Sequence, residues 1–241
     1  MSPSVKYKRV LVKLSGESLS GAGGSRIDSE AITRTTAELI AIRQAGAQVA
    51  VVVGAGNLVR GRDLNSNPDI RRTTADYMGM LATVTNALAL RDSLESRGAP
   101  ALAMSAIPMP SVCETFNGRH AIAALEAGQI VVFGGGTGSP FFTTDTCAAL
   151  RACEIGADVL IKATQVDGVF DADPKTHPEA RKYDELTYEK VLADRLGVMD
   201  LTAISLCMDS RLPIIVLASS KPGNLAAAVK GGKAGTLVRS K

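Results

Sequence analysis

The chain has 241 residues, of which 46% are hydrophobic, so it can bury the core of one or two domains of ordinary size. Its 27 basic and 24 acidic residues give a net charge of +3, and this near balance argues against nucleic acid or an anionic membrane as the main partner. No stretch approaches the roughly 20 consecutive apolar residues of a membrane-spanning helix.

Cysteine and histidine usage indicates a reducing compartment and argues against a zinc site. The cysteines, which form neither a CxxC pair nor a spaced framework, are Cys113, Cys147, Cys153 and Cys207. We expect them to be small buried hydrophobic residues. Only two histidines are present, without an HExxH motif. No apolar signal segment follows the basic N-terminal residues, so we expect a soluble cytoplasmic protein.

Strand and helix patterns alternate along the chain. In order, the predicted elements are a strand at Arg9–Leu14, a helix capped by Asp28 and stopped at Gly46, a strand at Gln48–Val53, a helix over 74–97, a strand at Ala101–Ser105, a helix over 121–127, a strand over 130–133, a helix over 147–154, a strand over 158–162, a hairpin arm at 166–170, a helix over 188–196, a strand over 214–217 and a helix over 225–229. This alternation predicts an α/β fold with a mostly parallel sheet covered on both faces. No linker or repeat divides the sequence, so we expect a single domain over 1–241.

Glycine-rich turns follow three of the predicted strands, after Leu14, Val53 and Phe133. Ligands of parallel α/β sheets bind beyond the carboxyl ends of strands, where bare backbone N–H groups attract anions. The chain has no Walker A segment, and Val59 replaces the third glycine of the GxGxxG pattern that begins at Gly54. The turns therefore predict phosphate binding without either common nucleotide motif.

Charged residues accompany these turns. Lys13 lies in an otherwise apolar strand and Lys162 ends another, so each either reaches water at an edge or meets an anion. Arg60 closes the second glycine turn. Asp145 lies near the start of a predicted helix, so it is either a helix cap or a functional carboxylate. Asp173 precedes a proline, so it either forms a turn or takes part in ligand binding.

Several long motifs in a fixed order resemble the amino-acid kinase family, and within it the bacterial UMP kinases, over nearly the whole chain. The segments are YKRVLVKLSGE (7–17), VVGAGNLVRG (52–61), ADYMGMLATVTN (75–86), MSAIP (104–108), GTGSPFFTTD (136–145) and KATQVDGVFDADP (162–174). The KLSG and TTD segments are similar to those of relatives that phosphorylate carboxylates or carbamate. The DYMGMLAT and MSAIP segments resemble the UMP enzymes specifically. The resemblance implies a three-layer αβα sandwich.

The resemblance also implies residue roles, with the N-terminal part binding mainly UMP and the C-terminal part mainly ATP. For ATP it implies Lys13, Leu14, Ser15, Gly16, Gly56, Arg60, Thr164, Phe170 and Asp173. For UMP it implies Ala55, Asp76, Thr137, Gly138, Ser139, Pro140, Phe141, Phe142, Thr143 and Thr144. The catalytic residues would be Lys13, Arg60, Asp145 and Lys162. Mg²⁺ would be held mainly by the ATP phosphates, without a direct protein ligand.

Assembly and regulation are likewise implied only by the resemblance. It implies a homohexamer that GTP activates and UTP inhibits. The effector residues would be Gly21, Ala22, Gly23, Gly24, Ser25, Arg26 and Arg91. Their alternative is a solvated loop and an arginine on a helix face.

Two positions depart from the family pattern, and other functions stay open. Ala55 replaces a usual glycine, which adds a methyl beside a phosphate, and Ser139 replaces a usual asparagine, whose amide both donates and accepts.

Rival interpretations are a kinase of an amino-acid carboxylate such as acetylglutamate or aspartate, a nucleotide sensor without catalysis, and a dinucleotide-binding dehydrogenase. Asp76 and the PFFTTD segment argue against the first, and the charged residues against the second.

The expected reaction needs no general base, because the phosphate of UMP is already a nucleophile near pH 7. The obstacle is bringing two polyanions together, so catalysis is expected from in-line positioning and charge neutralisation. On this hypothesis Lys13 and Lys162 stabilise the transferred phosphoryl group and Arg60 holds the UMP phosphate. Asp145 would orient Lys13, or the metal's hydration shell through water.

Overall fold

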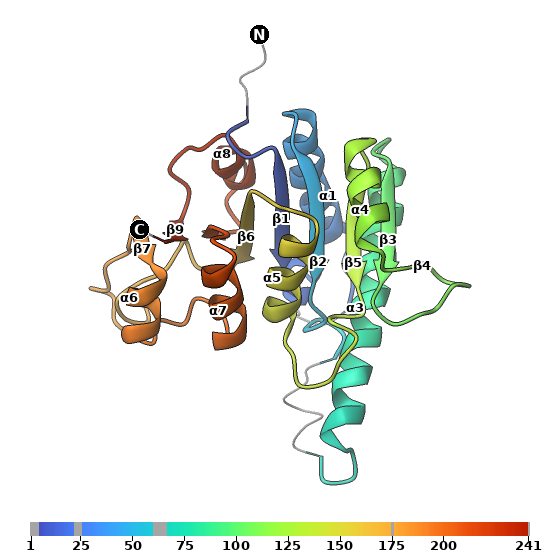
Figure 1. Cartoon of the computed structure of the whole chain (residues 1–241), viewed down its shortest axis with the longest axis horizontal. Coiled ribbons are helices and arrows are strands. Elements are labelled where there is room, and N and C mark those ends of the chain that lie inside the picture. Colours follow the sequence, from blue (N-terminus) through green and yellow to red (C-terminus); the bar gives the residue numbers. More distant parts are fainter. Residues whose placement is uncertain (1–4, 22–25, 60–66, 175, 241) are drawn as a thin grey trace.

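The computed structural model describes residues 5–21, 26–59, 67–174 and 176–240, which form one continuous nine-stranded sheet with helices on both faces (Figure 1). The strands are β1 (Arg9–Leu14), β2 (Gln48–Val53), β3 (Ala101–Ser105), β4 (Glu114–Thr115), β5 (Ile130–Gly134), β6 (Val159–Thr164), β7 (Glu185–Thr187), β8 (Ile214–Ala218) and β9 (Thr236–Arg239). The helices are η1, a 3-10 turn (Gly16–Leu19), α1 (Ser29–Gln44), α3 (Arg72–Glu95), α4 (Gly118–Glu126), α5 (Thr144–Glu154), α6 (Tyr188–Ala193), α7 (Leu201–Asp209) and α8 (Asn224–Val229).

The strand order is β4-β3-β5-β2-β1-β6-β8-β9-β7. All neighbouring pairs are parallel except β8 and β9, which are antiparallel. The predicted α/β fold with a mostly parallel sheet is therefore confirmed. The central strands β2, β1 and β6 end together at one edge, which brings the turns after Leu14 and Val53 side by side.

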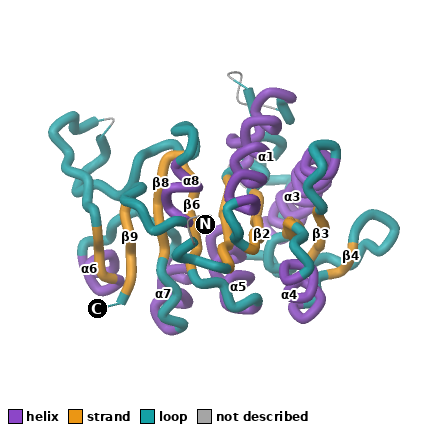
Figure 2. The backbone as a smooth tube through the Cα atoms, turned by 90° about the horizontal axis from the view of Figure 1, so that it is seen from above, coloured by secondary structure: helices purple, strands orange, loops and turns teal. Residues whose placement is uncertain are grey.

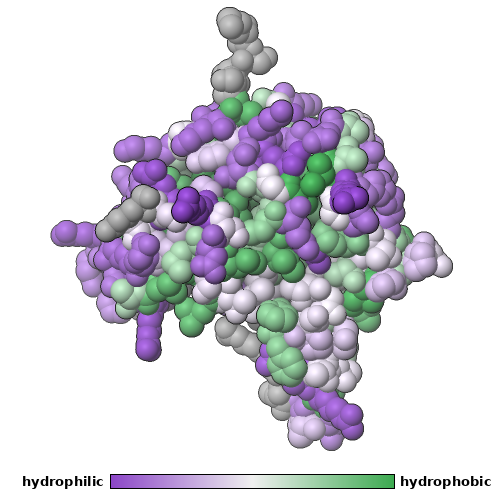
Figure 3. Space-filling view, viewed as in Figure 1, coloured by the Kyte–Doolittle hydropathy of each residue, from purple (hydrophilic) through white to green (hydrophobic). Residues whose placement is uncertain are grey.

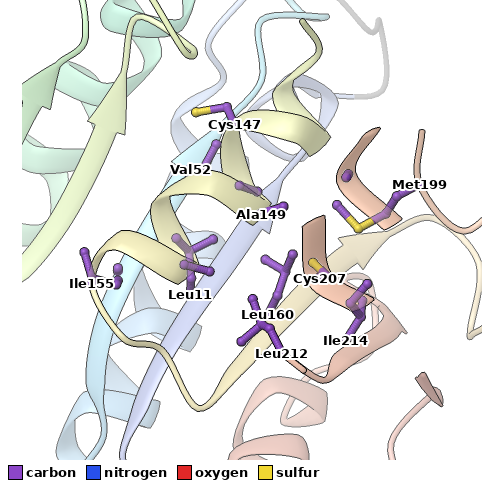
Figure 4. Packing of buried hydrophobic residues seen from close by; sticks show 14 of the residues in the cluster. Leu11, Val52, Cys147, Ala149, Ile155, Leu160, Met199, Cys207, Leu212 and Ile214 are labelled. Atoms are coloured by element: carbon purple, nitrogen blue, oxygen red, sulfur yellow. The ribbon is translucent and has the colours of Figure 1, made fainter. Parts of the chain in front are cut away.

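Two apolar layers flank the sheet because successive strand residues point to opposite faces. Val10 and Val12 of β1 pack with α1, α3 and α8, whereas Leu11 packs with α4, α5 and α7. Figure 2 shows α1 and α3 on one side of the strands and α4, α5 and α7 on the other. Figure 4 shows the second layer from close by, with Leu11 and Leu160 beneath α5 and α7. The fold is thus the three-layer αβα sandwich.

Some element boundaries differ from the sequence prediction. The helix expected over 147–154 begins three residues earlier, at Thr144, and the helix expected over 188–196 ends at Ala193. The hairpin arm is present as a single bridge between Phe170 and Lys182. The elements that the sequence did not predict are η1, β4, β7, α7 and β9.

The four cysteines are free thiols. Cys147 and Cys207 are buried as expected, and burial raises the pKa of each thiol to about 12. Cys113 and Cys153 are only half-buried. Within the ranges that the structure describes, no helix is both long and apolar enough to cross a bilayer.

Candidate functional site

The two predicted catalytic lysines lie side by side at the carboxyl edge of the sheet. Lys13 of β1 and Lys162 of β6 are register partners in a parallel pair, so their side chains leave the sheet on the same face. That face is the one covered by α5. Both side chains are largely buried, with exposed fractions of 13% and 17%. The alternative that either lysine lies at a sheet edge and faces water is therefore excluded.

Asp145, in the first turn of α5, lies between these two ammonium groups. Its Oδ1 is 2.9 Å from Nζ of Lys13, and its Oδ2 accepts a 2.7 Å hydrogen bond from Nζ of Lys162. The capping role belongs instead to Thr143, whose hydroxyl oxygen accepts from the backbone N–H groups of Asp145 and Thr146. The alternative interpretation of Asp145 as a helix cap is therefore wrong.

The electrostatics of this carboxylate favour its charged form. Burial alone would raise the pKa of Asp145, but the charges of Lys13 and Lys162 and the hydrogen bond from Lys162 more than offset it and hold the pKa below its usual value. Asp145 therefore stays ionised at neutral pH and leaves the three groups with a net positive charge.

The two lysines are held differently. Lys162 donates both to Asp145 and to the backbone carbonyl of Val198, 2.7 Å away, so two acceptors fix its position. Lys13 lies close to Oδ1 of Asp145 but is not aligned for a hydrogen bond, and Oδ1 has no hydrogen-bond partner among the described residues. Lys13 can thus turn toward a phosphate while breaking fewer hydrogen bonds than Lys162 would.

The first two glycine turns pack backbone against backbone beside Lys13. A Cβ at Gly16 would lie 2.4 Å from the backbone nitrogen of Gly56 and 2.8 Å from the carbonyl carbon of Ala55. A Cβ at Gly56 would lie 2.3 Å from Oε1 of Glu17. Glycine is required at position 16, where a Cβ would meet backbone atoms, whereas at position 56 the end of the Glu17 side chain could move aside. Arg60, the predicted arginine of the second turn, lies outside the described residues.

A buried pair of amides holds the second glycine turn to α3. Nδ2 of Asn86 donates to the Gly54 carbonyl at 2.8 Å and to Oδ1 of Asn57 at 2.8 Å, while Nδ2 of Asn57 donates back to Oδ1 of Asn86 at 3.1 Å. Both side chains are almost completely buried. The only sequence signal for this pair is that Asn86 interrupts the apolar face of a predicted helix.

The predicted acceptor residues from two distant segments meet in the structure. Asp76 of α3 accepts a 2.8 Å hydrogen bond from the backbone N–H of Phe141, and it also accepts from Nε of Arg72 at 2.9 and 3.0 Å. Phe141 has a φ of +72°, an uncommon conformation for a residue other than glycine, and its ring is exposed beneath the Arg72 guanidinium. The loop over 137–144 is therefore joined to Asp76 by a hydrogen bond, so two segments to which the resemblance assigns UMP contacts lie side by side.

Within this loop, Thr137 organises the turn that carries Ser139. The Thr137 hydroxyl donates to the carbonyl of Ser139 and accepts from its backbone N–H, at 3.0 and 3.2 Å. Gly138 adopts a φ of +81°, which favours glycine. The Ser139 backbone is therefore committed to the turn, and only its hydroxyl is left to contact a base.

Asp200 is a second residue that sequence reasoning missed. It caps α7 by accepting from the backbone N–H of Ala203, and its carboxylate also accepts from the hydroxyls of Thr143 and Thr146 at the start of α5. It thereby fixes the beginnings of α5 and α7 together, next to Asp145. The only available signal was an aspartate just before an apolar helix.

The remaining predicted ATP residues follow β6. The Thr164 carbonyl accepts from the backbone N–H and the hydroxyl of Ser219, at 2.9 and 3.1 Å. Phe170 lies on the hairpin arm opposite Lys182, and Asp173 lies in the turn beyond. These residues extend from the strand that carries Lys162.

Among the predicted effector residues that the structure describes, Gly21 and Arg91 border different cavities. Gly21 borders a cavity of about 630 Å³ between α1 and the turn that leads to α8, whereas Arg91 borders a separate pocket beside residues 110–114. Arg26 donates its backbone N–H to the Asn57 carbonyl at 2.9 Å. Ala22, Gly23, Gly24 and Ser25 lie outside the described residues.

Comparisons with known proteins agree with this geometry. Residues 8–218 match the model of the amino acid kinase family. The chain is 52% identical, over 98% of each sequence, to a uridylate kinase of Xanthomonas campestris pv. campestris. It is 48% identical to the chloroplastic uridylate kinase PUMPKIN of Arabidopsis thaliana, covering 98% of this chain and 70% of that protein.

Solved structures give the same picture. The UMP kinase of Bacillus anthracis is 38% identical with a TM-score of 0.94, and the match covers 98% of this chain and 97% of that one. The uridylate kinase of Archaeoglobus fulgidus is 33% identical with a TM-score of 0.71, covering 95% of this chain and 99% of that one. The similarity thus extends over the whole sheet.

Proposed function

This chain belongs to the amino acid kinase family, and on that premise we propose that it transfers the terminal phosphate of ATP to UMP, giving ADP and UDP. The observation that carries the proposal is the pair of lysines held on one carboxylate at the carboxyl edge of the sheet. On one side of them lies the loop joined to Asp76, and on the other lies the segment that follows β6. Names of relatives that match nearly the full length support the same reaction.

The acceptor would lie toward the N-terminal part of the chain and the donor toward the C-terminal part. Asp76 would receive the ribose of UMP, with the loop over 137–144 around its base and phosphate. Thr164, Phe170 and Asp173 would surround the nucleoside of ATP. The phosphates of both nucleotides would meet at Gly16 and Gly56, with Ala55 and Ser15 beside them and Arg60 on the UMP phosphate.

The chemistry asked of the chain is positioning and neutralisation of charge. The acceptor phosphate attacks in line, and negative charge spreads over the equatorial oxygens of the transferred group. Lys13 and Lys162 stabilise that charge from the sheet. Asp145 keeps the two cations apart and oriented until the nucleotides arrive. No side chain is needed as a proton acceptor.

Mg²⁺ fits this arrangement as the companion ion of ATP. Among the residues described, no three His, Cys, Asp or Glu side chains cluster closely enough to hold a metal, and Asp145 is already paired with two lysines. The ion would take its ligands from phosphate oxygens and water, with Asp145 reaching it only through water. When bound, it neutralises charge on the ATP phosphates.

Assembly, regulation and location complete the proposal. We expect a homohexamer that GTP activates and UTP inhibits, which would bring effector residues of several subunits together. Such an arrangement is needed because Gly21 and Arg91 border different cavities of one chain. The free thiols suit a reducing compartment, so the expected location is the cytoplasm.

The decisive experiment compares phosphate transfer from Mg-ATP to UMP, CMP, dUMP and acetylglutamate with the purified protein. Turnover with UMP alone is expected. Turnover with CMP as well would keep the kinase and move uracil selectivity away from Ser139, and transfer only to acetylglutamate would overturn the substrate. Nucleotide binding without transfer to any acceptor would favour a sensor instead.

A matched pair of variants tests the catalytic assignment. Lys13→Ala is expected to lower kcat by about 10³-fold, because it removes a preorganised cation from the developing charge. Lys190→Ala, which removes an exposed lysine paired with Asp194 on α6, serves as the control. Near-normal turnover of a folded Lys13→Ala variant would show that the lysine is not catalytic.

A further inference from the structure

One buried hydroxyl bonds the hairpin arm that carries Phe170 to the sheet, beside the core side chain of Val169. Thr236, the first residue of β9, is fully buried. Its Oγ1 accepts a 2.9 Å hydrogen bond from the backbone N–H of Val169 and donates to the carbonyl of Tyr183. These two residues face each other across the base of the arm, where the N–H of Tyr183 also donates to the Val169 carbonyl at 2.9 Å.

The backbone at this point is shaped around that hydroxyl. Gly168 has a φ of +134°, and a Cβ there would lie 2.6 Å from Oγ1 of Thr236. Glycine therefore allows the arm to approach β9 closely enough for the hydrogen bond. Phe170 follows two residues later.

A second polar attachment of the arm's first strand is less well shielded from water. Asp167 pairs with Lys221 at 2.5 Å and with Lys182 at 3.6 Å; the Lys221 side chain is exposed, and the other two are half-buried. Exposed ion pairs contribute little to holding a segment in place. A buried hydroxyl that satisfies one donor and one acceptor contributes more, because its loss leaves both groups unpaired in the interior.

We propose that Thr236 is a positioning residue for ATP, which sets the orientation of the arm that contacts the donor nucleoside. This inference rests on the proposed function, because it takes Phe170 and Asp173 to belong to the ATP site. It assigns a role in donor binding to the C-terminal strand. That strand lies beyond the segment, 8–218, that the family model matches.

The test replaces the hydroxyl with a methyl of similar size. Thr236→Val is expected to raise the KM for ATP by about tenfold, which corresponds to part of the cost of leaving a buried amide unpaired. The KM for UMP should stay within about twofold, because the acceptor loop lies on other strands. Thr236→Ser keeps the hydroxyl and should restore ATP binding. Equilibrium binding of ATP measured by calorimetry, without UMP, gives an independent readout.

Thr36→Val is the matched control. Thr36 is also a fully buried threonine, but its hydroxyl bonds to carbonyls of its own helix, α1. This variant should lose stability without separating the two KM values. If Thr236→Val weakens ATP and UMP equally, or binds ATP as the natural protein does, the positioning role is wrong.

The experiment also distinguishes failure of the proposed function from failure of the Thr236→Val variant to fold. If the natural protein binds ATP but transfers nothing to UMP, the proposed function fails while the ATP affinities of the variants still decide the role of Thr236. If Thr236→Val does not fold, Gly168→Ala disturbs the same contact from the side of the arm. An unchanged ATP affinity in that variant would overturn the proposal.

Discussion

Asp145 shows how one residue can carry two plausible roles in a sequence and only one in the structure. A carboxylate at the start of a helix favours capping, and the preceding threonines obscured which residue caps α5. Because Thr143 takes the cap, the carboxylate of Asp145 is free to face Lys13 and Lys162. The stability of the site therefore depends on the negative charge of Asp145, and that charge depends on the pH.

We predict that Asp145→Asn lowers the free energy of unfolding at pH 7 by about 3 kcal/mol, because two partly buried ammonium groups lose their counter-charge. The pKa of Asp145 is lowered in the folded protein, so its stabilisation is fully present above the unfolded value of about 3.9 and is lost as the pH falls through the lower folded value. Urea unfolding of both proteins from pH 7 down to pH 3 measures this.

The expected signature is a difference in stability that is constant near neutral pH and shrinks below about pH 4. Asp158→Asn, in the turn before β6, provides a control carboxylate, because its side chain accepts a 2.8 Å hydrogen bond from a backbone N–H, that of Arg9. A difference for Asp145→Asn that stays the same down to pH 3 would contradict the paired, ionised state.

At the scale of elements, the second glycine turn depends on a helix that is distant in sequence. Asn86 of α3 reaches the Gly54 carbonyl and Asn57, and Asn57 in turn reaches the Arg26 carbonyl at 3.4 Å. The amide pair therefore links the second glycine turn to α3, which also carries Asp76. The turn proposed to bind phosphate and one proposed UMP residue are thus connected through the same helix.

We predict that Asn86→Leu costs about 2 to 4 kcal/mol of unfolding free energy, since the Gly54 carbonyl and the Asn57 amide lose their partner in the interior. Urea unfolding measures the change. Thr85→Leu introduces the same side chain one residue earlier, at an exposed position of the same helix, and should change stability by less than about 0.5 kcal/mol. Equal effects of the two variants would show that the amide pair contributes nothing specific.

The elements also show what the sequence could and could not predict. Long apolar strands such as β1 and β2, and the helices between them, follow from periodicity, and the lysine pair follows from their parallel register. The strands β4, β7 and β9 have two to four residues, too few for an alternating pattern. Their formation depends on neighbouring strands. For that reason Thr236, which no motif marks, was found only in the structure.

For the candidate site, the sequence predicted the main charged residues but not their contacts. Motif order brought Lys13, Asp145 and Lys162 into one hypothesis, but not the distances that make Lys162 fixed and Lys13 less restrained. Asn57 and Asp200 act through tertiary hydrogen bonds to segments tens of residues away, which a single sequence does not reveal.

At the scale of the whole molecule, α3 is incompletely covered. Figure 1 shows its N-terminal half projecting beyond the sheet. Figure 3 shows the projecting part of the molecule as mostly pale and hydrophilic residues, with a smaller hydrophobic patch. Tyr77, Met78 and Leu81 are exposed there by 43%, 38% and 48%. Apolar side chains grouped on a projecting helix indicate a contact surface, which agrees with the homohexamer expected for this chain.

We predict that Leu81→Lys lowers the oligomeric state, because a charge replaces an exposed leucine that assembly would bury. The natural protein is expected to sediment with about six times the mass of the chain, and the variant with a smaller mass at the same concentration. Analytical ultracentrifugation makes the comparison. Leu201→Lys, which changes a more exposed leucine at the start of α7, is the control and should leave the mass unchanged.

The consequence for activity separates assembly from catalysis. Leu81 lies about one helical turn beyond Tyr77, so an assembly that covers this surface would also steady the helix that carries Asp76, which is proposed to hold the acceptor. Loss of the oligomer should therefore raise the KM for UMP more than the KM for ATP. A natural protein that sediments as a monomer, or a Leu81→Lys variant with unchanged mass, would show that α3 is not the surface through which the chains associate.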